Sequence, residues 1–351
     1  MRAVVAHGPG DFRLEDVARP ARQRGAVLEI EAAGVCAADR MIWRGDGPWE
    51  LAFPFTPGHE ILGRVVWIDD RSAGHWRVGV GDRVTAEVMV PCRRCRLCRA
   101  GRRNLCRFGT HLGSGLPGAF AEQMALPPEA VVHEVPPDLD TTAAVLVEPA
   151  ACAVHALRRA EITRDDVVAI AGIGSIGAAA LGTAAGRARR LVAVVTSPAR
   201  AELARALGAD EAVDVSAGPG RDELPDGLLP GVDALLELTG GHGPDVFVDC
   251  SGSPEAVELG LAALVPGGRL VLYGVYRRRA GIDLNLVAEH KELDVRGGHL
   301  APGAFPEALE LLQAGTIDAE RIVTHRHGLD DVHAAVGEVP AGDRLKAILV
   351  P

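Results

Sequence analysis

The sequence predicts an α/β fold with two domains, one rich in short β-strands and one built on a doubly wound parallel sheet. Its 351 residues exceed what one ordinary hydrophobic core accommodates. Apolar residues make up 48% of the chain and charged residues 24%, which is the composition of a globular protein that buries a core. In the C-terminal half, strand-like and helix-like runs alternate, the pattern of a parallel sheet covered by helices.

Each element of the parallel sheet is predicted from its own pattern. The first strand, "DVVAIAG", leads into the helix-compatible "AAALGTAAGRA". Further strands are "RLVAVV", "AVDV", "DVFVDCSG" and "GRLVLYGV", with helical patterns at "AELARALGA" and "PEAVELGLAALV" between them. The segment Ser216–Gly231, rich in Pro and Gly, interrupts the alternation and is expected to be an acidic surface loop. Short β patterns fill the N-terminal part, and the chain closes with the strand-like "RLKAILV".

Charge and hydropathy exclude several classes of protein. The formal net charge of -10 argues against a nucleic acid as the main partner. No apolar run approaches the roughly 18 residues of a membrane span, and Met1–Gly10 lacks the apolar core of a signal peptide. We therefore expect a cytoplasmic protein without a membrane partner. In that reducing compartment, clustered cysteines favour metal binding over disulfides.

Four of the seven cysteines lie in the stretch "PCRRCRLCRAGRRNLC". Their spacing, C-x2-C-x2-C-x7-C, lets the thiolates turn toward one point and predicts a structural zinc ion. The ligands would be Cys92, Cys95, Cys98 and Cys106. The interleaved arginines would offset the negative charge of four thiolates, and some could donate to the sulfurs. Two alternatives stay open: an iron–sulfur cluster, although Arg107 stands where ferredoxins usually have proline, and a basic zinc ribbon that contacts nucleic acid.

A second set of metal ligands lies outside this stretch. "GVCAAD" contributes Cys36, "PGHE" contributes His59 and Glu60, and "LVEPAAC" contributes Glu148. Each of them has an ordinary structural explanation when taken alone. Together, thiolate, imidazole and carboxylate form the mixed ligand set of a catalytic zinc, which keeps one position open and acidifies a bound alcohol. Asp39 is expected to hold the other ring nitrogen of His59.

The glycines of "GIGSIG" predict a dinucleotide site. Gly172, Gly174 and Gly177 follow a predicted strand and open a predicted helix, which is the context that the G-x-G-x-x-G pattern requires. The first glycine would make the tight turn, the second would admit a pyrophosphate, and the third would allow close packing of helix and strand. The enclosed Ser175 and Ile176 are expected at the same site, because the anion sits at the helix N-terminus.

The next strand bears on the choice of cofactor. An acidic residue at its end would accept the ribose hydroxyls of NAD, but the chain has Val195, Thr196 and Ser197 there. Thr196, Ser197 and Arg200 could instead bind a 2′-phosphate, which favours NADP over NAD. In the alternative interpretation, Ser197 caps a helix and Arg200 is solvated. Ser251, in "VDCSG", completes the expected cofactor contacts.

These motifs in this order resemble the zinc-dependent medium-chain dehydrogenase/reductase family, over nearly the whole chain. The likeness is greatest to polyol dehydrogenases of the sorbitol, threitol and erythritol type, on "PGHE", "VGDRV", the cysteine stretch, "VEPAACAVHAL", "AGIGSIG" and "VDCSGSPEAVELGLAALVPGGRLVLYG". The resemblance implies a GroES-like catalytic domain over residues 1–150 with the zinc lobe at about 91–107. It implies a Rossmann domain over 151–286 and a return to the catalytic domain over 287–351. It also implies a homodimer or homotetramer.

By the same resemblance, Cys36, His59 and Glu148 hold the catalytic zinc, and Glu60 enters or leaves its coordination. One position departs from the family. A serine or threonine commonly stands two residues after the catalytic cysteine and passes the substrate proton outward, and here that position is Ala38. Glu60, a zinc-linked water or a neighbouring substrate hydroxyl would have to replace it.

The expected activity is oxidation of a secondary hydroxyl of a polyol, sugar or (amino)cyclitol to a ketone, with hydride transfer to NAD(P)⁺. An amino-alcohol dehydrogenase of the threonine type is the alternative within the class. A zinc-ribbon regulatory protein that uses the dinucleotide fold as a sensor is the alternative from another class. Zinc-free reductases share the fold but lack the second ligand set.

Overall fold

The computed structural model describes residues 1–216, 229–337 and 345–351. Most of the predicted acidic loop at Ser216–Gly231 lies outside these residues. The chain divides into two compact units. The first unit comprises Met1–Ala151, Leu300–Gly315 and Ala319–Pro351, and the second comprises Cys152–His299 and Thr316–Asp318.

A predominantly antiparallel sheet forms the centre of the first unit. Its strands lie in the order β16-β17-β3-β4-β5-β9, and β8 also pairs with β3. Only β16 and β17 run parallel among these described pairs. The strand bounds are β3 Ala26–Val35, β4 Glu60–Ile68, β5 Arg83–Ala86, β8 Gln123–Leu126, β9 Val132–Glu134, β16 Val323–Gly328 and β17 Lys346–Val350. Three distant segments of the chain therefore meet in one sheet.

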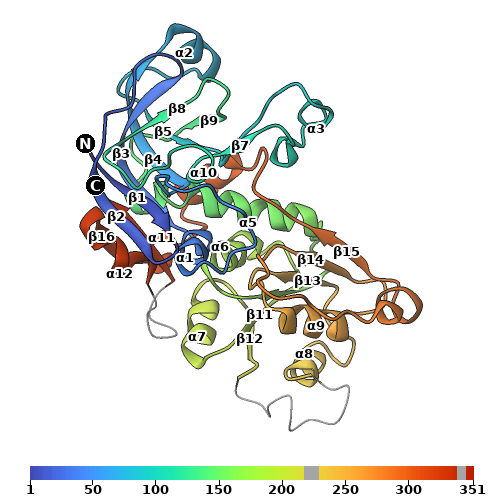
Figure 1. Ribbon diagram of the computed structural model, residues 1–351. Helices are drawn as coiled ribbons and strands as arrows, with labels where there is room; N and C mark the ends of the chain where they lie inside the picture. Colours follow the sequence, from blue (N-terminus) through green and yellow to red (C-terminus); the bar gives the residue numbers. More distant parts are fainter. Residues whose placement is uncertain (217–228, 338–344) are drawn as a thin grey trace. The chain divides into compact units, whose positions relative to one another are not determined.

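Two hairpins and short helices complete the first unit (Figure 1). The hairpin strands are β1 Arg2–Gly8 with β2 Asp11–Asp16, and β6 Met89–Val90 with β7 Thr110–His111. The helices are α1 Ala37–Arg44, α2 Asp70–Trp76, α3 Arg96–Arg99, η1 Arg103–Leu105, α4 Thr141–Ala144, α10 Phe305–Gln313, α11 Ala319–Ile322, η4 Leu329–Asp331 and α12 Val332–Val336. α5, Val147–Ala160, runs from the end of the first unit into the second.

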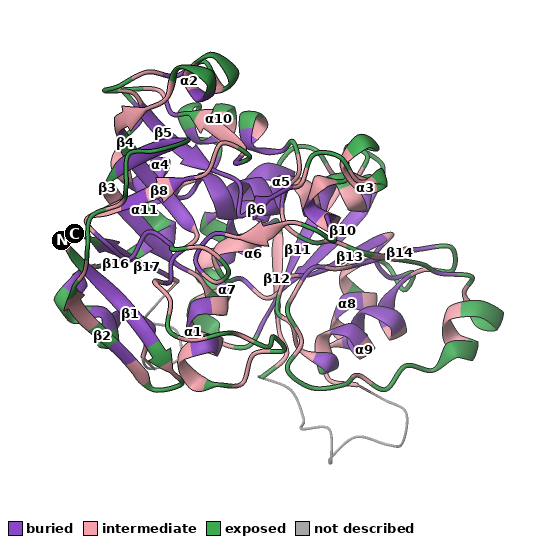
Figure 2. Ribbon diagram, turned by 45° about the horizontal axis from the view of Figure 1, so that its top comes forward, coloured by how far each residue is buried: buried purple, intermediate pink, exposed green. Residues whose placement is uncertain are grey.

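The core of the first unit lies against the sheet. Almost every residue of β3 and all of β5 are buried, as Figure 2 shows. Large buried side chains around them include Phe12, Phe120, Met124 and Leu126. Burying such side chains contributes about 1.5–3 kcal/mol each. A well-packed sheet thus supports the residues at the ends of β3 and β4.

The second unit contains a parallel six-stranded sheet, counted over the residues that the structure describes. Its strand order is β12-β11-β10-β13-β14-β15, so the sheet grows outward in both directions from β10 and β13. This is the doubly wound order, with its switch point between those two strands. The bounds are β10 Val167–Ala171, β11 Arg190–Val195, β12 Glu211–Asp214, β13 Val246–Asp249, β14 Arg269–Leu272 and β15 Asp294–Gly297. The predicted α/β fold is confirmed.

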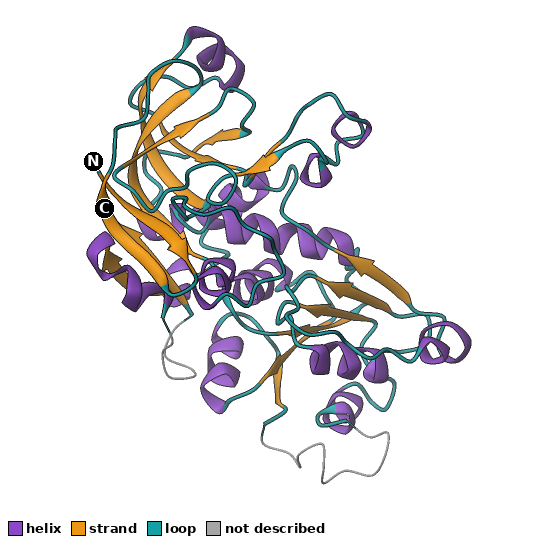
Figure 3. Cartoon of the chain, in the orientation of Figure 1, coloured by secondary structure: helices purple, strands orange, loops and turns teal. Residues whose placement is uncertain are grey.

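Helices cover the sheet of the second unit (Figure 3). They are α6 Ser175–Ala184, α7 Pro198–Ala206, α8 Val232–Leu238, α9 Pro254–Ala263 and η3 Leu286–His290. Phe247 and the valines of β10 and β11 are fully or almost fully buried beneath them. α7 begins before the predicted apolar pattern, because Ser197 caps the helix and Pro198 occupies its first position.

The second unit also extends further than the sequence suggests. The predicted return to the catalytic domain begins at residue 287, but β15 still pairs with β14 of the parallel sheet. The unit therefore continues to His299. The strand is short and largely exposed, so its apolar pattern is weak. Among the described helices, none is both long enough and apolar enough to cross a membrane.

Candidate active site

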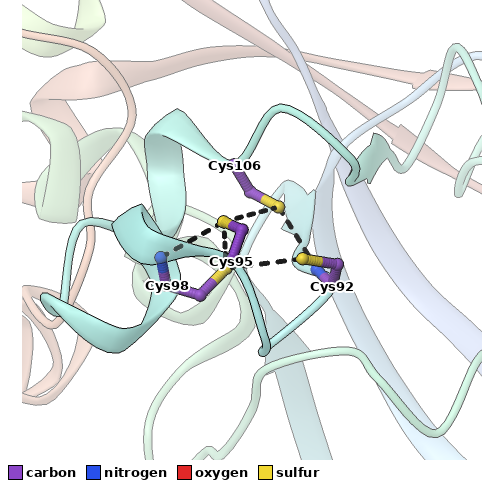
Figure 4. Close-up of side chains that lie close together, drawn as sticks. All are labelled: Cys92, Cys95, Cys98 and Cys106. Atoms are coloured by element: carbon purple, nitrogen blue, oxygen red, sulfur yellow. Dashed lines mark hydrogen bonds between the residues drawn. The ribbon is translucent and has the colours of Figure 1, made fainter.

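The four clustered cysteines converge on one point in the first unit (Figure 4). The Sγ atoms of Cys95 and Cys98 are 3.5 Å apart, those of Cys95 and Cys106 3.9 Å, and those of Cys92 and Cys98 4.0 Å. Four sulfurs at a Zn–S distance of 2.3 Å would be separated by about 3.8 Å in a tetrahedron. A disulfide would instead require about 2.05 Å. The free thiols are therefore already spaced as zinc ligands.

Backbone amides stabilise these sulfurs. The N–H of Cys92 donates to Cys106 Sγ at 3.3 Å, and the N–H of Cys98 donates to Cys95 Sγ at 3.4 Å. The backbone N–H of Arg94 is the largest cause that lowers the pKa of Cys92, to about 6. Thiolates are the form that binds metal. The hydrogen bonds found thus come from the backbone, where the sequence suggested arginine side chains.

One of those arginines instead anchors the lobe to the sheet. Arg103 binds both carboxylate oxygens of the buried Glu87, which lies between β5 and β6. His133 Nε2 lies 3.2 Å from the same carboxylate, and its ring stacks on Phe305. Burial works to raise the pKa of Glu87, but Arg103 and His133 outweigh it and hold this pKa below its usual value. Such an ionised, partly buried pair fixes the segment that leads into Cys106.

Three of the four residues of the second predicted ligand set come together in the first unit. Donor atoms of Cys36, His59 and Glu60 lie within 4.8 Å of one another. Cys36 is the N-cap residue of α1, at the end of β3, and Glu60 begins β4. Because β3 and β4 are antiparallel neighbours, the end of one strand meets the start of the other. The sheet register thus joins residues that are far apart in the sequence.

Asp39 supports this cluster from within α1. It is fully buried, and its Oδ2 accepts the backbone N–H of Cys36 at 2.8 Å. Its Oδ1 lies 3.8 Å from His59 Nδ1, beyond hydrogen-bond distance but close enough for the charge to act on the ring. Burial raises the pKa of Asp39 above its usual value. For His59, burial works to lower the pKa, but nearby Cys36 and Asp39 outweigh it and raise this pKa well above its usual value. The surroundings of the ring are therefore strongly anionic and favour a cation.

Glu148 stands somewhat apart from the other three ligand candidates. It lies in the first turn of α5 and is 5% exposed. Its charge contributes to raising the pKa of His59, so the carboxylate lies near enough to act on the imidazole through its charge. However, its carboxylate does not join the group of atoms within 4.8 Å. The compact set is Cys36, His59 and Glu60, with Glu148 nearby.

Lys346 is a residue of this cluster that the sequence analysis missed. Its side chain and that of Glu60 are each 1% exposed, and its Nζ lies 2.5 Å from Glu60 Oε1. Burial works to lower the pKa of Lys346, but the charges of Glu60 and Cys36 outweigh it and raise this pKa above its usual value. In the sequence, this lysine is recognisable as a single charged residue at the start of the otherwise apolar strand "KAILV".

The glycine turn of the second unit has the geometry of a dinucleotide site. Gly172 follows β10 with a φ of 83°, and a Cβ there would lie 2.5 Å from Cα of Ser251. A Cβ on Gly177 would lie 2.1 Å from the carbonyl oxygen of Gly172. By contrast, a Cβ on Gly174 would meet no atom within 4 Å. The first and third glycines are required by packing, and the second leaves open space at the N-terminus of α6.

Ser251 is held in place by residues that sequence reasoning did not identify. Its N–H and hydroxyl both donate to Oδ1 of Asp249, a fully buried residue at the end of β13. Tyr276 donates its hydroxyl to the other carboxylate oxygen at 2.5 Å. These hydrogen bonds fix the turn after β13, at the switch point of the sheet.

The residues expected to select the cofactor lie after β11. Ser197 is the N-cap residue of α7, and its Oγ accepts the N–H of Arg200 at 3.3 Å. Thr196 is exposed, and Arg200 is partly buried, which lowers its pKa. Ser175 and Ile176 form the first turn of α6. Ser197 therefore caps α7, as in the alternative interpretation, and the exposed Thr196 directly follows β11.

Comparison with known proteins identifies the fold and the class. Residues 22–137 match the alcohol dehydrogenase GroES-like domain, and residues 172–314 match the zinc-binding dehydrogenase domain. The erythritol/L-threitol dehydrogenase of Mycolicibacterium smegmatis is 36% identical, over 100% of this chain and 98% of the relative. The L-threonine 3-dehydrogenase of Burkholderia ambifaria is 34% identical, over 99% and 98%. The structure of a zinc-binding dehydrogenase from Sinorhizobium meliloti 1021 bound to NADP superposes with a TM-score of 0.85 at 29% identity, over 100% of this chain and 99% of that one.

The fold and the domain matches define an oxidoreductase of the alcohol dehydrogenase class, which uses zinc and a nicotinamide dinucleotide. More particularly, the chain belongs to the zinc-dependent medium-chain dehydrogenase/reductase family. The GroES-like and Rossmann folds implied by the sequence motifs are confirmed.

Proposed function

We propose that the protein oxidises a secondary hydroxyl of a polyol, sugar or (amino)cyclitol to a ketone and transfers the hydride to NADP⁺. The observation that carries this proposal is the cluster of the partly buried Cys36 and His59 with the buried Glu60, and with Glu148 nearby. The relative at 36% identity supports a polyol substrate, because by its name it acts on erythritol and L-threitol.

The residues of the cluster suit a catalytic zinc. Cys36, His59 and a carboxylate supply sulfur, nitrogen and oxygen donors, and the Oε2 atom of Glu60 is buried without a hydrogen-bond partner. When bound there, zinc acts as a Lewis acid that lowers the pKa of the substrate hydroxyl. Asp39 orients the imidazole of His59 and fixes the backbone of Cys36, so the donors keep their positions.

The cofactor is held by the second unit. The open side of Gly174 would admit the pyrophosphate, and the N–H groups of Ser175 and Ile176 at the start of α6 would bind it. The nicotinamide of the cofactor would supply the hydride acceptor. Thr196 and Arg200 support NADP over NAD, because neither contributes a carboxylate that would repel a 2′-phosphate.

Ala38 leaves the substrate proton without the hydroxyl that commonly receives it in this family. Glu60 offers an acceptor for this proton, since Lys346 occupies only its Oε1 and its Oε2 has no hydrogen-bond partner. We propose that Glu60 or a neighbouring hydroxyl of the polyol takes the proton. A polyhydroxylated substrate would then be preferred over a simple secondary alcohol.

The test is the appearance of reduced nicotinamide absorbance with NADP⁺ and NAD⁺ in parallel. The substrates are tetritols, pentitols, hexitols, cyclitols, aminocyclitols and L-threonine, with 2-butanol as the simple alcohol. We expect turnover of polyols with NADP⁺ and little with 2-butanol. Turnover of L-threonine alone would support the amino-alcohol alternative that the relative from Burkholderia represents. Absence of turnover with every substrate, in protein that carries zinc, would contradict the proposal.

The cysteine lobe is proposed to hold a second, structural zinc. Cys95→Ala removes one of four converging sulfurs and should lower the zinc content from two ions to one per chain. Thermal stability should fall, because zinc binding by such a site contributes folding free energy. Metal analysis and the melting temperature measure both effects.

The substrate preference of the folded Cys95→Ala enzyme should stay unchanged. A changed order of substrates would show that the lobe takes part in substrate binding, against the structural assignment. Size-exclusion chromatography with light scattering of the same samples would test the proposed homodimer or homotetramer.

A further inference from the structure

Lys346 is a buried charge whose purpose the proposed reaction does not explain. The chain has 37 basic residues, and its only lysines are Lys291 and Lys346. Lys346 begins β17, and its side chain is 1% exposed. An ammonium group removed from water is unfavourable unless it is paired, so its partners indicate its role.

Those partners are the carboxylate of Glu60 and the backbone next to Cys36. The Nζ of Lys346 donates to Glu60 Oε1 at 2.5 Å and to the carbonyl oxygen of Val35 at 3.1 Å. Val35 immediately precedes Cys36 at the end of β3. One ammonium therefore contacts both the carboxylate of Glu60 and the backbone that carries the thiol. Glu60 Oε2 remains buried without a hydrogen bond.

Gly34 confines the same carboxylate from the opposite strand. Gly34 pairs directly with Glu60 in the β3–β4 register. A Cβ on Gly34 would lie 1.9 Å from Glu60 Oε2 and 2.9 Å from its Cδ, which is closer than real Cβ atoms approach. The carboxylate therefore occupies the space that a side chain at position 34 would fill. Its position is set by the lysine and by the absence of a side chain on Gly34.

Charge and coordination explain why such control is useful. The thiolate of Cys36 and the carboxylate of Glu148 already balance a divalent cation, and a catalytic zinc needs one open position. A third anion, placed within 4.8 Å of Cys36 and His59, could fill that position. An ammonium is a compact point charge, so it can compete with the metal for one carboxylate oxygen.

Building on the proposed function, we propose that Lys346 is a positioning residue that tethers Glu60 and keeps its carboxylate from closing the position needed by the substrate hydroxyl. The tether leaves the carboxylate of Glu60 close to the metal, with one of its oxygens bound to the ammonium. Loss of the ammonium would leave the metal as the nearest cation for Glu60.

Lys346→Met tests the tether, because methionine has a similar length and no charge. In metal-loaded protein we expect the zinc content to remain at two ions per chain. We expect kcat to fall on the order of 10–100-fold, the usual effect of altering groups behind the ligands. In the cobalt-substituted protein, the visible absorption bands should change, because the coordination of the metal changes. The double variant Lys346→Met/Glu60→Gln should recover the wild-type bands, because the neutral amide competes weakly for the metal.

Lys291→Met is the matched control in the second unit. The Nζ of Lys291 donates to the carbonyl oxygens of Leu261, Ala262 and Leu264, so the variant also loses hydrogen bonds, which are partly buried. It should lower the melting temperature and leave the cobalt bands unchanged. If Lys346→Met behaves in the same way, with unchanged kcat per bound zinc, its role is structural and the proposal is overturned. Loss of the zinc held by Cys36 in Lys346→Met would also overturn it.

A second variant tests the proposal in case Lys346→Met folds poorly. Gly34→Ala displaces Glu60 from the other side and keeps the ammonium, so it should also change the cobalt bands, and unchanged bands would overturn the proposal. If the proposed function is wrong, the wild-type protein will lack zinc at Cys36 or will not turn over substrate. Failure of the tether alone leaves a wild type that binds two zinc ions and turns over substrate.

Discussion

Cys36→Ser should lower kcat/KM by about 10³-fold or more and reduce the zinc content from two ions to one per chain. The Lewis acid contributes several kcal/mol to the stabilisation of the transition state, and each 1.36 kcal/mol corresponds to a factor of ten. Cys36 follows β3 and lies in the cluster with His59 and Glu60, whereas the four sulfurs of the lobe form a separate cluster. The remaining zinc should therefore be that of the lobe. Metal analysis and steady-state kinetics measure the two effects.

Two further variants show whether the loss of activity is specific to the metal ligand Cys36. Asp39→Asn keeps every ligand but removes the charge that lies 3.8 Å from His59 Nδ1, so a smaller loss of about 10–100-fold is expected. Cys152→Ala removes a buried thiol outside both clusters and should retain the activity and both zinc ions. If Cys36→Ser kept full activity, the cluster would not be the catalytic centre. Binding of a ligand without turnover would then favour the sensor alternative.

Gly174→Ala should weaken cofactor binding on the order of tenfold, about 1.4 kcal/mol, without lowering the melting temperature. Gly174 has a φ of -85°, which alanine adopts easily, and its Cβ would meet no atom of the protein within 4 Å. The added methyl group would instead occupy the space proposed for the pyrophosphate. Fluorescence titration with NADPH and a thermal melt separate the two effects. Unchanged affinity would contradict the assignment of this turn.

Gly172→Ala is the matched comparison. At a φ of 83°, with Ser251 backbone atoms 2.5–2.6 Å from the new Cβ, alanine is strained before any ligand binds. Left-handed backbone costs about 1–2 kcal/mol for a residue with a Cβ, and overpacking about 1–3 kcal/mol. This variant should therefore lose stability as well as cofactor affinity. A Gly172→Ala protein with the wild-type melting temperature would mean that the turn is less tightly packed than the structure indicates.

Local patterns were sufficient for most of the second unit. The apolar strands and the spacing of Gly172, Gly174 and Gly177 predicted β10, the turn and α6, because all of these features lie within about twenty residues. β15 was missed, since its short, exposed sequence has no clear period and depends on β14 for its hydrogen bonds. The network of Asp249, Ser251 and Tyr276 was also missed, because it joins the end of β13 to the segment after β14.

By itself, the sequence determined the chemistry available to this protein: four thiols at zinc spacing, a second set of soft and hard donors, and a glycine turn for a dinucleotide. Residue types and short spacings are local properties, so a sequence displays them directly. The tertiary structure decided how those groups are arranged. It joined Glu60 to Lys346 across 286 positions of the chain, turned Arg103 toward Glu87, and placed Gly34 where a side chain would displace the carboxylate. These pairings depend on strand register and on the burial of charge, which arise only when distant segments pack into one sheet.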